Sequence, residues 1–423
     1  MVGYEESVVP AAENALLAGH DMIFLGERGQ GKSRMIRALI GLLDEEVPAI
    51  EGSDVNDDPH NPISKFGQQR VAECGDSTPI AWISREQRYG EKLATPDVTM
   101  ADLIGEIDPI KVAEGHYLAD EATIHFGLIP RTNRGIFCIN ELPDLAEKVQ
   151  VGLFNVLEER DFQVKGFKVR LPLDILVVAS ANPEDYTRRG RIITPLKDRY
   201  QAQIRTHYPA SRSLEIQVME QEHRATGGSG VDVEVPTFVK ELIAELTVQA
   251  RQSPDVSATS GVSVRVSIAN YETLIAAAER RALRLGEKTA VPRISDLGAL
   301  LTPTAGKIEL EYGGSEVGET AVVEGLLLRA IKVVFDECFE LEELAPVVGS
   351  FGSGWKVEVG DEMASADYLS GLDQIEGLRA AVEKLGGTRS PDHVASTIEF
   401  ILEGLHLSNQ LNKDLQGRRV LYR

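Results

Sequence analysis

The residues with the clearest chemical potential lie near the start of the chain. Residues 26–33 read Gly-Glu-Arg-Gly-Gln-Gly-Lys-Ser and fit the pattern G-x-x-x-x-G-K-[ST]. In that pattern the glycines let backbone N–H groups turn toward phosphate oxygens, the lysine reaches the terminal phosphates, and the hydroxyl can bind Mg²⁺. The segment therefore predicts ATP and Mg²⁺ as ligands. The predicted contact residues are Gly26, Gly29, Gln30, Gly31, Lys32 and Ser33.

The sequence on both sides of this segment supports the same interpretation. Residues 22–25 are apolar and predict a buried strand, and residues 34–43 predict a helix. A strand before the loop and a helix after it are what the motif requires. The alternative is an ordinary glycine-rich turn. Average residue frequencies would give this pattern by chance in roughly one or two per cent of chains of this length, which makes that alternative the weaker one.

A second pair of candidate residues, Asn140 and Glu141, follows the apolar run 136–139. Hydrolysis needs a group that holds the magnesium shell and a carboxylate that polarises the attacking water. The usual pair at this point is Asp-Glu, so Asn140 offers a neutral oxygen to the metal, and Glu141 is the predicted base. We expect weaker metal binding rather than lost chemistry. The alternative is that Asn140 caps a helix that begins near Pro143.

A third polar residue, Asn182, comes just after the apolar run 175–179. Ligands of open α/β sheets bind at the carboxyl ends of the parallel strands, so an amide at this point can orient the attacking water. By itself the dipeptide Asn182-Pro183 would indicate an ordinary turn. Its position after the two preceding motifs favours the functional interpretation.

These motifs require a scaffold of alternating strands and helices. From residue 21 to about residue 209, short apolar runs alternate with helical patterns, which is typical of an α/β domain with a buried parallel sheet. After residue 209, segments with a 3.6-residue period dominate and strand-like runs become rare. The expected helices are 238–252, 266–285 and 321–344, and the expected loops are 227–230 and 253–263.

Charge and composition narrow the classes of function. The 423 residues carry 44 lysines and arginines against 66 aspartates and glutamates, a net charge of −22, which disfavours bulk nucleic-acid binding. The seven acidic residues between positions 44 and 58 predict a solvated loop rather than a cation site. The three cysteines form no CxxC pair and indicate reduced thiols. No apolar run is long enough to cross a bilayer and no signal peptide is evident, which predicts a cytoplasmic location.

The order of motifs resembles the AAA+ ATPases, and within them the magnesium chelatase ATPase subunit and the MoxR-type ATPases. The resemblance covers residues 2–209 well and the helical remainder loosely. It implies a P-loop AAA+ core over residues 1–209, a helical lid over 210–312 and a helical C-terminal extension over 313–423. The segments that carry it are 105–115, 127–135, Asn140-Glu141, Asn182-Pro183-Glu184 and 196–200.

The resemblance also implies two elements that face the pore of a ring and remodel a partner protein. Residues 117–132 would hold an insertion in the second helix. Residues 162–170 alternate about Lys165-Gly166 as a β-hairpin should. The alternative is a plain surface hairpin without a partner.

Four residues receive their roles from the resemblance. Asn182 would be the first sensor, and Arg199 the arginine finger offered to the γ-phosphate of a neighbouring subunit. Arg265 would be the second sensor, in the lid. Gly3 would lie in the stretch that contacts adenine. For each arginine, the alternative is a surface ion pair.

The resemblance implies a ring-forming ATPase, a hexamer, that acts on a partner protein, which could carry a von Willebrand A-type domain. The alternative is a nucleotide-gated assembly or scaffold protein, in which Asn140 makes hydrolysis slow or absent. A third possibility, an activator of the transcription machinery, would need a Gly-Ala-Phe-Thr-Gly-Ala pore loop, which the sequence lacks.

Overall fold

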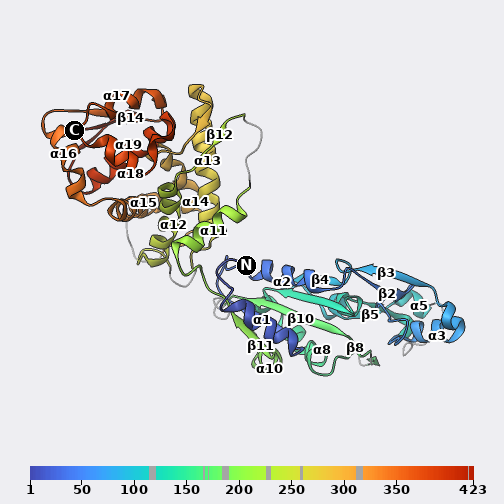
Figure 1. Ribbon diagram of the computed structural model, residues 1–423. Helices are drawn as coiled ribbons and strands as arrows, with labels where there is room; N and C mark the ends of the chain where they lie inside the picture. The colour runs from blue at the N-terminus through green and yellow to red at the C-terminus, as the bar shows by residue number, and fades with distance from the viewer. Residues whose placement is uncertain are drawn as a thin grey trace. The chain divides into compact units, whose positions relative to one another are not determined.

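The computed structural model describes residues 1–113, 121–164, 167–169, 171–182, 190–224, 230–257, 261–310, 318–417 and 419–423. The chain divides into two compact units, residues 3–207 and residues 208–423 (Figure 1).

The first unit is built on a five-stranded sheet in which every neighbouring pair of strands is parallel. The strand order is β11-β1-β10-β7-β4, so the first strand lies inside the sheet and the chain crosses over to build both sides. The strands are β1 (Met22–Leu25), β4 (Tyr89–Leu93), β7 (Gly135–Asn140), β10 (Ile175–Ala181) and β11 (Ala202–Arg205).

Helices cover both faces of this sheet because successive side chains of each strand point to opposite sides. In β1, Met22 and Phe24 are buried in the cluster that contains α1 (Val8–Leu17) and α2 (Lys32–Ala38). Ile23 is buried in the cluster on the other face, with the 3₁₀ helix η4 (Leu142–Asp144), α7 (Glu147–Gly152), α8 (Phe154–Glu158) and α10 (Thr194–Arg199). This arrangement confirms the predicted α/β fold class.

Smaller elements complete the first unit. Three antiparallel pairs are present, and the pair β8 with β9 confirms the hairpin predicted over residues 162–170, although its turn, Lys165-Gly166, lies outside the described residues. Of the expected insertion over 117–132, residues 117–120 also lie outside them. The pairs are β2 (Glu46–Ile50) with β3 (Ile80–Ser84), β5 (Gly105–Ile107) with β6 (Ile124–Phe126), and β8 (Phe162–Val164) with β9 (Phe167–Val169); the helices are α3 (Lys65–Cys74), α4 (Met100–Leu103), α5 (Pro109–Ala113) and α6 (Leu128–Arg131).

The acidic stretch over residues 44–58 is only in part the predicted solvated loop: most of its acids are exposed, but the prediction was wrong for residues 46–50, which form a strand, and for Asp57. It contains strand β2, and it buries Asp57 completely. The Asp57 carboxylate accepts hydrogen bonds from the backbone N–H groups of Ile63 at 2.7 Å and Ser64 at 2.8 Å, and from the Ser53 hydroxyl at 2.7 Å. A buried carboxylate that satisfies several donors organises the chain around it, whereas a count of charges alone indicates only solvation.

The second unit is mainly helical and has one large apolar core. The predicted helices at 238–252 and 266–285 are observed as α12 and α13, while the one expected at 321–344 ends at Cys338 and is followed by a short 3₁₀ turn. Its helices are α11 (Arg212–Glu222), α12 (Thr237–Gln252), α13 (Arg265–Leu285), α14 (Leu301–Ala305), α15 (Glu319–Cys338), α16 (Ala345–Gly352), α17 (Leu369–Leu372), α18 (Leu378–Lys384) and α19 (Pro391–Leu407), with 3₁₀ helices η5 (Ile294–Leu300), η6 (Leu341–Leu344), η7 (Ser365–Tyr368) and η8 (Gly387–Arg389).

The same unit also contains strands that the hydrophobic pattern did not predict. A three-stranded antiparallel sheet has the order β14-β16-β15, formed by β14 (Val357–Gly360), β15 (Lys413–Gln416) and β16 (Arg419–Tyr422). A parallel pair joins β12 (Asp232–Val233) to β13 (Thr289–Ala290). The expected loop at 227–230 lies almost wholly outside the described residues. The division of this half into a lid at 210–312 and an extension at 313–423 stays a prediction.

Candidate functional site

The loop at residues 26–31 has the backbone geometry of a phosphate cradle. Gly29 and Gly31 adopt φ values of 76° and 73°, a left-handed conformation that glycine adopts without steric cost. At Gly26 an added Cβ would lie 1.9 Å from the Thr206 hydroxyl oxygen and 2.2 Å from the Gln30 amide oxygen, so a larger residue would displace these two side chains. All three glycines of the motif therefore have a structural reason for their identity.

Lys32 begins helix α2 and is almost completely buried. Its ammonium group donates hydrogen bonds to the Glu27 carbonyl oxygen at 2.8 Å and to the Gly26 carbonyl oxygen. These bonds keep the ammonium group against the backbone of the glycine-rich loop. A cation held in this way is placed to meet the terminal phosphates of a nucleotide in the loop.

The side chain of Gln30 braces the loop. Its amide oxygen accepts hydrogen bonds from the Glu27 backbone N–H at 3.1 Å and from the Thr206 hydroxyl at 2.7 Å. Thr206 follows strand β11 directly, so this contact ties the loop to the neighbouring strand of the sheet. Gln30 was predicted as a ligand contact, and its side chain here serves the shape of the loop.

The N-terminal stretch also reaches the loop. The Tyr4 hydroxyl lies 2.6 Å from the Gln30 carbonyl oxygen and 2.8 Å from the His207 carbonyl oxygen. Gly3 precedes it with a left-handed φ of 81°. Tyr4 therefore anchors the segment predicted to contact adenine beside the glycine-rich loop, while the contact of Gly3 with adenine stays a prediction.

Three neighbouring strands deliver polar side chains to the sheet face that α2 covers. In β7 the alternation that directs Ile136 and Cys138 to this face also directs Asn140 there, and Ser180 of β10 follows Val178 in the same way. Glu91 of β4 reaches the same place and contacts Asn140. The parallel register therefore gathers a carboxylate, an amide and a hydroxyl beside the start of α2.

Asn140 lies at the centre of this group and is 7% exposed. Its amide oxygen accepts a hydrogen bond from the Ser180 hydroxyl at 3.1 Å and lies 3.5 Å from the Ser33 hydroxyl oxygen. Its amide nitrogen donates to a carboxylate oxygen of Glu91. The alternative role as a helix cap is wrong, because Glu141 occupies the N-cap position of η4 and no side chain caps that helix.

Glu91 is held by several donors at once. Arg37, on the second turn of α2, donates to its two carboxylate oxygens at 2.9 and 3.1 Å, and the Tyr89 hydroxyl donates at 3.0 Å. The hydrogen bond from Arg37 is the main reason that the pKa of Glu91 is lowered from its ordinary value. Burial, chiefly, raises the pKa of Tyr89, so the phenol stays a donor. Glu91 is therefore a carboxylate at neutral pH.

Glu141 and Asn182 follow the ends of adjacent strands, β7 and β10, as predicted. Glu141 is half-buried and takes a left-handed backbone conformation with φ of 54°, which is uncommon for a residue with a side chain. Its N–H donates to the Ser180 hydroxyl at 3.2 Å. Asn182 is 3% exposed. The roles of Glu141 as base and Asn182 as sensor stay predictions.

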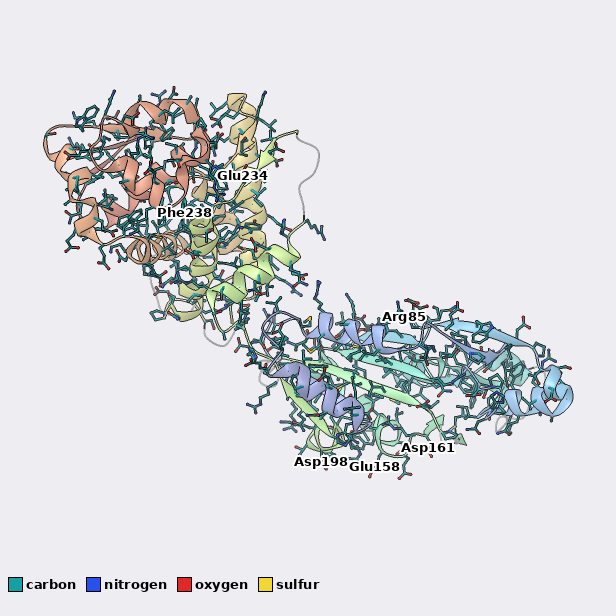
Figure 2. The ribbon with its side chains drawn as sticks, viewed as in Figure 1. Arg85, Glu158, Asp161, Asp198, Glu234 and Phe238 are labelled. Carbon is teal, nitrogen blue, oxygen red and sulfur yellow. The ribbon has the colours of Figure 1, made fainter. Side chains whose placement is uncertain are left out.

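Arg199 forms an ion pair within the chain. Its guanidinium nitrogens lie 2.6 and 2.9 Å from a carboxylate oxygen of Glu158, which Figure 2 labels, and its guanidinium carbon lies 4.4 Å from the centre of the Phe154 ring. The structure of a single chain therefore contains the surface ion pair that was the alternative to a finger, and the role toward a neighbouring subunit stays a prediction. Arg265 is the exposed first residue of α13, in the second unit.

The donors beside the glycine-rich loop fit Mg²⁺ and a triphosphate. Magnesium prefers oxygen ligands, and Ser33 and Asn140 offer a hydroxyl and an amide oxygen that are 3.5 Å apart. Lys32 supplies a positive charge to the phosphates. Among the described residues, no cluster of three or more histidine, cysteine or acidic side chains could hold a metal ion, and no helix is long and apolar enough to cross a membrane.

The chain is similar to several proteins of known families. The family model of the Sigma-54 interaction domain matches residues 112–200, which is less than half of the chain. The magnesium-chelatase subunit ChlI of Nostoc is 28% identical over 258 residues, covering 58% of this chain and 62% of the relative. The chain is similar to AAA+ ATPases of the magnesium chelatase group.

Other relatives show the same partial coverage. The magnesium-chelatase 38 kDa subunit of Cereibacter sphaeroides is 26% identical over 201 residues, covering 47% of this chain and 54% of the relative. The chain thus spans between a half and two thirds of the length of these curated relatives. The similarity describes a shared part of the proteins and not their whole activity.

Among solved structures, the similarity is loose. The complex between subunits BchI and BchD of magnesium chelatase matches with a TM-score of 0.40 at 21% identity, covering 77% of this chain and 97% of the matched chain. NtrX from Brucella abortus matches with a TM-score of 0.42 at 14% identity, covering 89% and 69%.

Three residues of this site were not predicted from the sequence. Ser180 and Thr206 could have been found from strand geometry. Ser180 precedes Asn182 by two positions in an apolar strand, and Thr206 directly follows a strand. Glu91 lies in a strand whose residues are mostly polar and only partly buried, so no apolar run marks it. One signal for Glu91 was available in the sequence. Asn140 is neutral where a carboxylate is usual, and this suggests that a neighbouring strand supplies the missing negative charge.

Proposed function

We propose that this AAA+ protein binds Mg·ATP in the loop at residues 26–33 and hydrolyses it at the interfaces of a ring, using the resulting movement to remodel a partner protein. The single observation that carries the proposal is the arrangement at the start of α2. There, Lys32 is held against the loop and Ser33 lies 3.5 Å from Asn140. The proposed phosphate and metal ligands thus lie together at the carboxyl ends of the parallel strands.

The chemistry follows from the positions of the side chains. Glu141 takes a proton from the attacking water, and Asn182, after the next strand, orients that water. Lys32 and Arg199 balance the negative charge that spreads over the transferring phosphoryl group. Bound Mg²⁺ supplies charge neutralisation between the phosphates, and Ser33 with Asn140 would hold it.

Assembly enters the proposal through Arg199. In one chain Arg199 is paired with Glu158 and packs on Phe154, on the unit that also carries the nucleotide loop. For service in a neighbouring site, the guanidinium exchanges an exposed carboxylate for a phosphate. An exposed ion pair contributes little stability, about 0–1 kcal/mol, so this exchange costs little.

A mixing experiment tests hydrolysis and assembly together. Glu141→Gln leaves a subunit with its finger but without its base, and Arg199→Ala leaves a subunit with its base but without its finger. Each variant alone should lose most of its ATPase activity, by about 10²-fold or more. A mixture should regain activity, because an Arg199→Ala site can receive the finger of a Glu141→Gln neighbour. Full activity of Arg199→Ala alone would overturn the interface model.

A second function is favoured by one specific observation, the amide of Asn140 at the place of the usual carboxylate. In this alternative the protein is a nucleotide-gated assembly or scaffold protein that hydrolyses ATP slowly or not at all. Size measurement by light scattering, with ATP and with a non-hydrolysable analogue, separates the two. A scaffold assembles fully with the analogue and shows no turnover, whereas a remodelling ATPase shows steady turnover that rises with protein concentration.

The finer parts of the proposal concern partners and place. We infer a hexamer that works in the cytoplasm, together with a partner protein that could carry a von Willebrand A-type domain. The relatives are named as subunits of magnesium chelatase, which supports assembly with other proteins. Pull-down with the purified chain in the presence of ATP, followed by mass spectrometry, tests for such a partner.

A further inference from the structure

The amide at position 140 raises a question about charge. A neutral side chain there has two faces, an oxygen that can serve a metal and an NH₂ group that repels it. Only one of the two orientations is useful beside Ser33. A carboxylate has no such ambiguity, so replacing it with an amide requires something that fixes the orientation.

The surroundings of Asn140 fix it from both sides. Ser180 and Ser33 place hydroxyl groups near the amide oxygen, at 3.1 and 3.5 Å, while Glu91 places a carboxylate against the amide nitrogen. An ionised carboxylate accepts hydrogen bonds and cannot donate them, so it tolerates only the NH₂ group as its neighbour. Rotation of the amide by 180° would set two oxygens in contact.

Glu91 is itself prevented from turning away. Arg37 and Tyr89 occupy its two oxygens, and only 23% of its side chain is exposed. Arg37 follows Ser33 by one helical turn, so the same helix carries both the metal ligand and the group that holds Glu91. The result is a closed circuit of contacts from α2 to β4, then to β7, and back to α2.

We propose that Glu91 is a positioning residue for the magnesium site: it holds the Asn140 amide with its oxygen toward Ser33 and supplies, one strand away, the negative charge that position 140 lacks. This inference rests on the proposed function for its magnesium part. The contact between Glu91 and Asn140 stands independently of any nucleotide.

The inference has a consequence for the obvious repair, Asn140→Asp. In the native background the new carboxylate would face the carboxylate of Glu91 at hydrogen-bond distance, and like charges this close disfavour each other. In the background of Glu91→Gln the same exchange would meet an NH₂ donor instead. The effect of Asn140→Asp should therefore change sign with the residue at position 91.

A double-mutant cycle tests this in the full chain. The four proteins are wild type, Glu91→Gln, Asn140→Asp and the double variant. The first measurement is the Mg²⁺ concentration that gives half-maximal binding of a fluorescent ATP analogue. We expect Asn140→Asp to raise it in the native background and to lower it in the Glu91→Gln background, with a coupling of at least about fivefold.

The second measurement is the melting temperature of the four proteins without nucleotide. Asn140→Asp should lower it, and the double variant should recover most of the loss, since the two residues exchange roles and keep one donor and one acceptor. Additive effects in both measurements would overturn the inference. Coupling in the melting temperatures without coupling in Mg²⁺ affinity would reduce Glu91 to a structural partner and would overturn its role toward the metal.

Arg37→Gln is the matched variant. It removes the ion pair between α2 and Glu91 while leaving Asn140, Glu91 and its hydrogen bond from Tyr89 in place. Because Arg37 is one of the two groups that hold Glu91, the coupling should be smaller in this background than in the native one. A coupling of unchanged size would show that Arg37 does not hold Glu91 in place, against the proposal. If wild type binds no ATP analogue in Mg²⁺, the proposed function fails, while the melting cycle still decides whether Glu91 and Asn140 are coupled.

Discussion

At the scale of single residues, the two residues that begin α2 have different proposed ligands: the terminal phosphates for Lys32 and the metal for Ser33. Lys32 is buried and donates to two carbonyl groups of the loop, whereas Ser33 is exposed at the same helix start. Replacement of Lys32 by alanine should weaken ATP binding about 100-fold or more, because the cation that meets the terminal phosphates is gone. Ser33→Ala should bind ATP without Mg²⁺ as wild type does, and should lose the enhancement by Mg²⁺. Isothermal titration calorimetry with and without Mg²⁺ measures both.

The thiol of Cys138 offers a check on the strand that carries Asn140. Cys138 is completely buried in β7, and burial is the main reason that its pKa is raised to about 12. Alkylation requires the thiolate, which at pH 8 is about one part in 10⁴ for such a group. Cys138 should therefore resist iodoacetamide in the native protein at pH 8 and react after unfolding in guanidinium chloride. Mass spectrometry of the labelled peptides decides, and rapid native labelling would contradict the buried sheet.

At the scale of elements, the network around Asp57 shows how a charged residue can order a segment. Asp57→Ala would leave the N–H groups of Ile63 and Ser64 and the Ser53 hydroxyl without their acceptor. Hydrogen bonds to a charged group contribute roughly 1.5–3 kcal/mol each, and a buried donor left unpaired adds a cost. We expect the free energy of unfolding of the first unit to fall by about 2 kcal/mol or more, measured by urea denaturation. Asp54→Ala, which removes an exposed acid in the same stretch, serves as the control.

The same element scale explains what the sequence could and could not predict. The strands β1, β7 and β10 are buried on both faces, so each has a continuous apolar run that predicts it from the sequence. The polar residues that follow β7 and β10 predicted the site. β4 lies at the sheet edge and consists mainly of half-exposed, polar residues. Because it has no apolar run, neither the strand nor Glu91 could be predicted from the hydrophobic pattern. The acidic residues around β2 led to the prediction of a loop. The burial of Asp57 could not be predicted either, because it depends on donors that come together only when the chain folds.

The contact partner of Arg199 could not be predicted from the sequence, for a different reason. Arg199 ends a short helix, and a motif can identify the residue, but its partner in one chain, Glu158, lies 41 residues earlier on another helix. Tertiary structure and assembly determine which partner an arginine binds. The local spacing of residues in the sequence predicts neither of them. For that reason the fold class followed from periodicity, whereas the contacts of each site residue required the structure.

At the scale of the whole molecule, the second unit behaves as one body built from both of its halves. Phe238 of α12, labelled in Figure 2, stacks on Phe400 of α19 with ring centres 4.5 Å apart. The polar contacts cross the same boundary at residue 312: the Ser295 N–H donates to Glu399 at 2.8 Å, and the fully buried guanidinium of Arg293 donates to the Ser365 hydroxyl. A cut at 312 would therefore expose apolar rings and leave a buried cation without its hydroxyl partner.

Deletion of residues 313–423 should for this reason unfold the remainder of the second unit rather than remove an appendage. Truncating one aromatic side chain in a core costs about 3–5 kcal/mol, whereas a typical domain is stabilised by only about 5–15 kcal/mol. The deletion removes all the core side chains of α15 and α19 together, so its cost should exceed the stability of the unit. A chain of residues 1–312 should lose most of the helical circular dichroism signal of residues 208–312 and be cleaved there by low concentrations of trypsin. A chain of residues 1–207 is the control, since it keeps its own sheet and both of its apolar clusters. A trypsin-resistant 208–312 fragment would show instead that this segment has a core of its own, and the predicted boundary between lid and extension would then also be a boundary in stability.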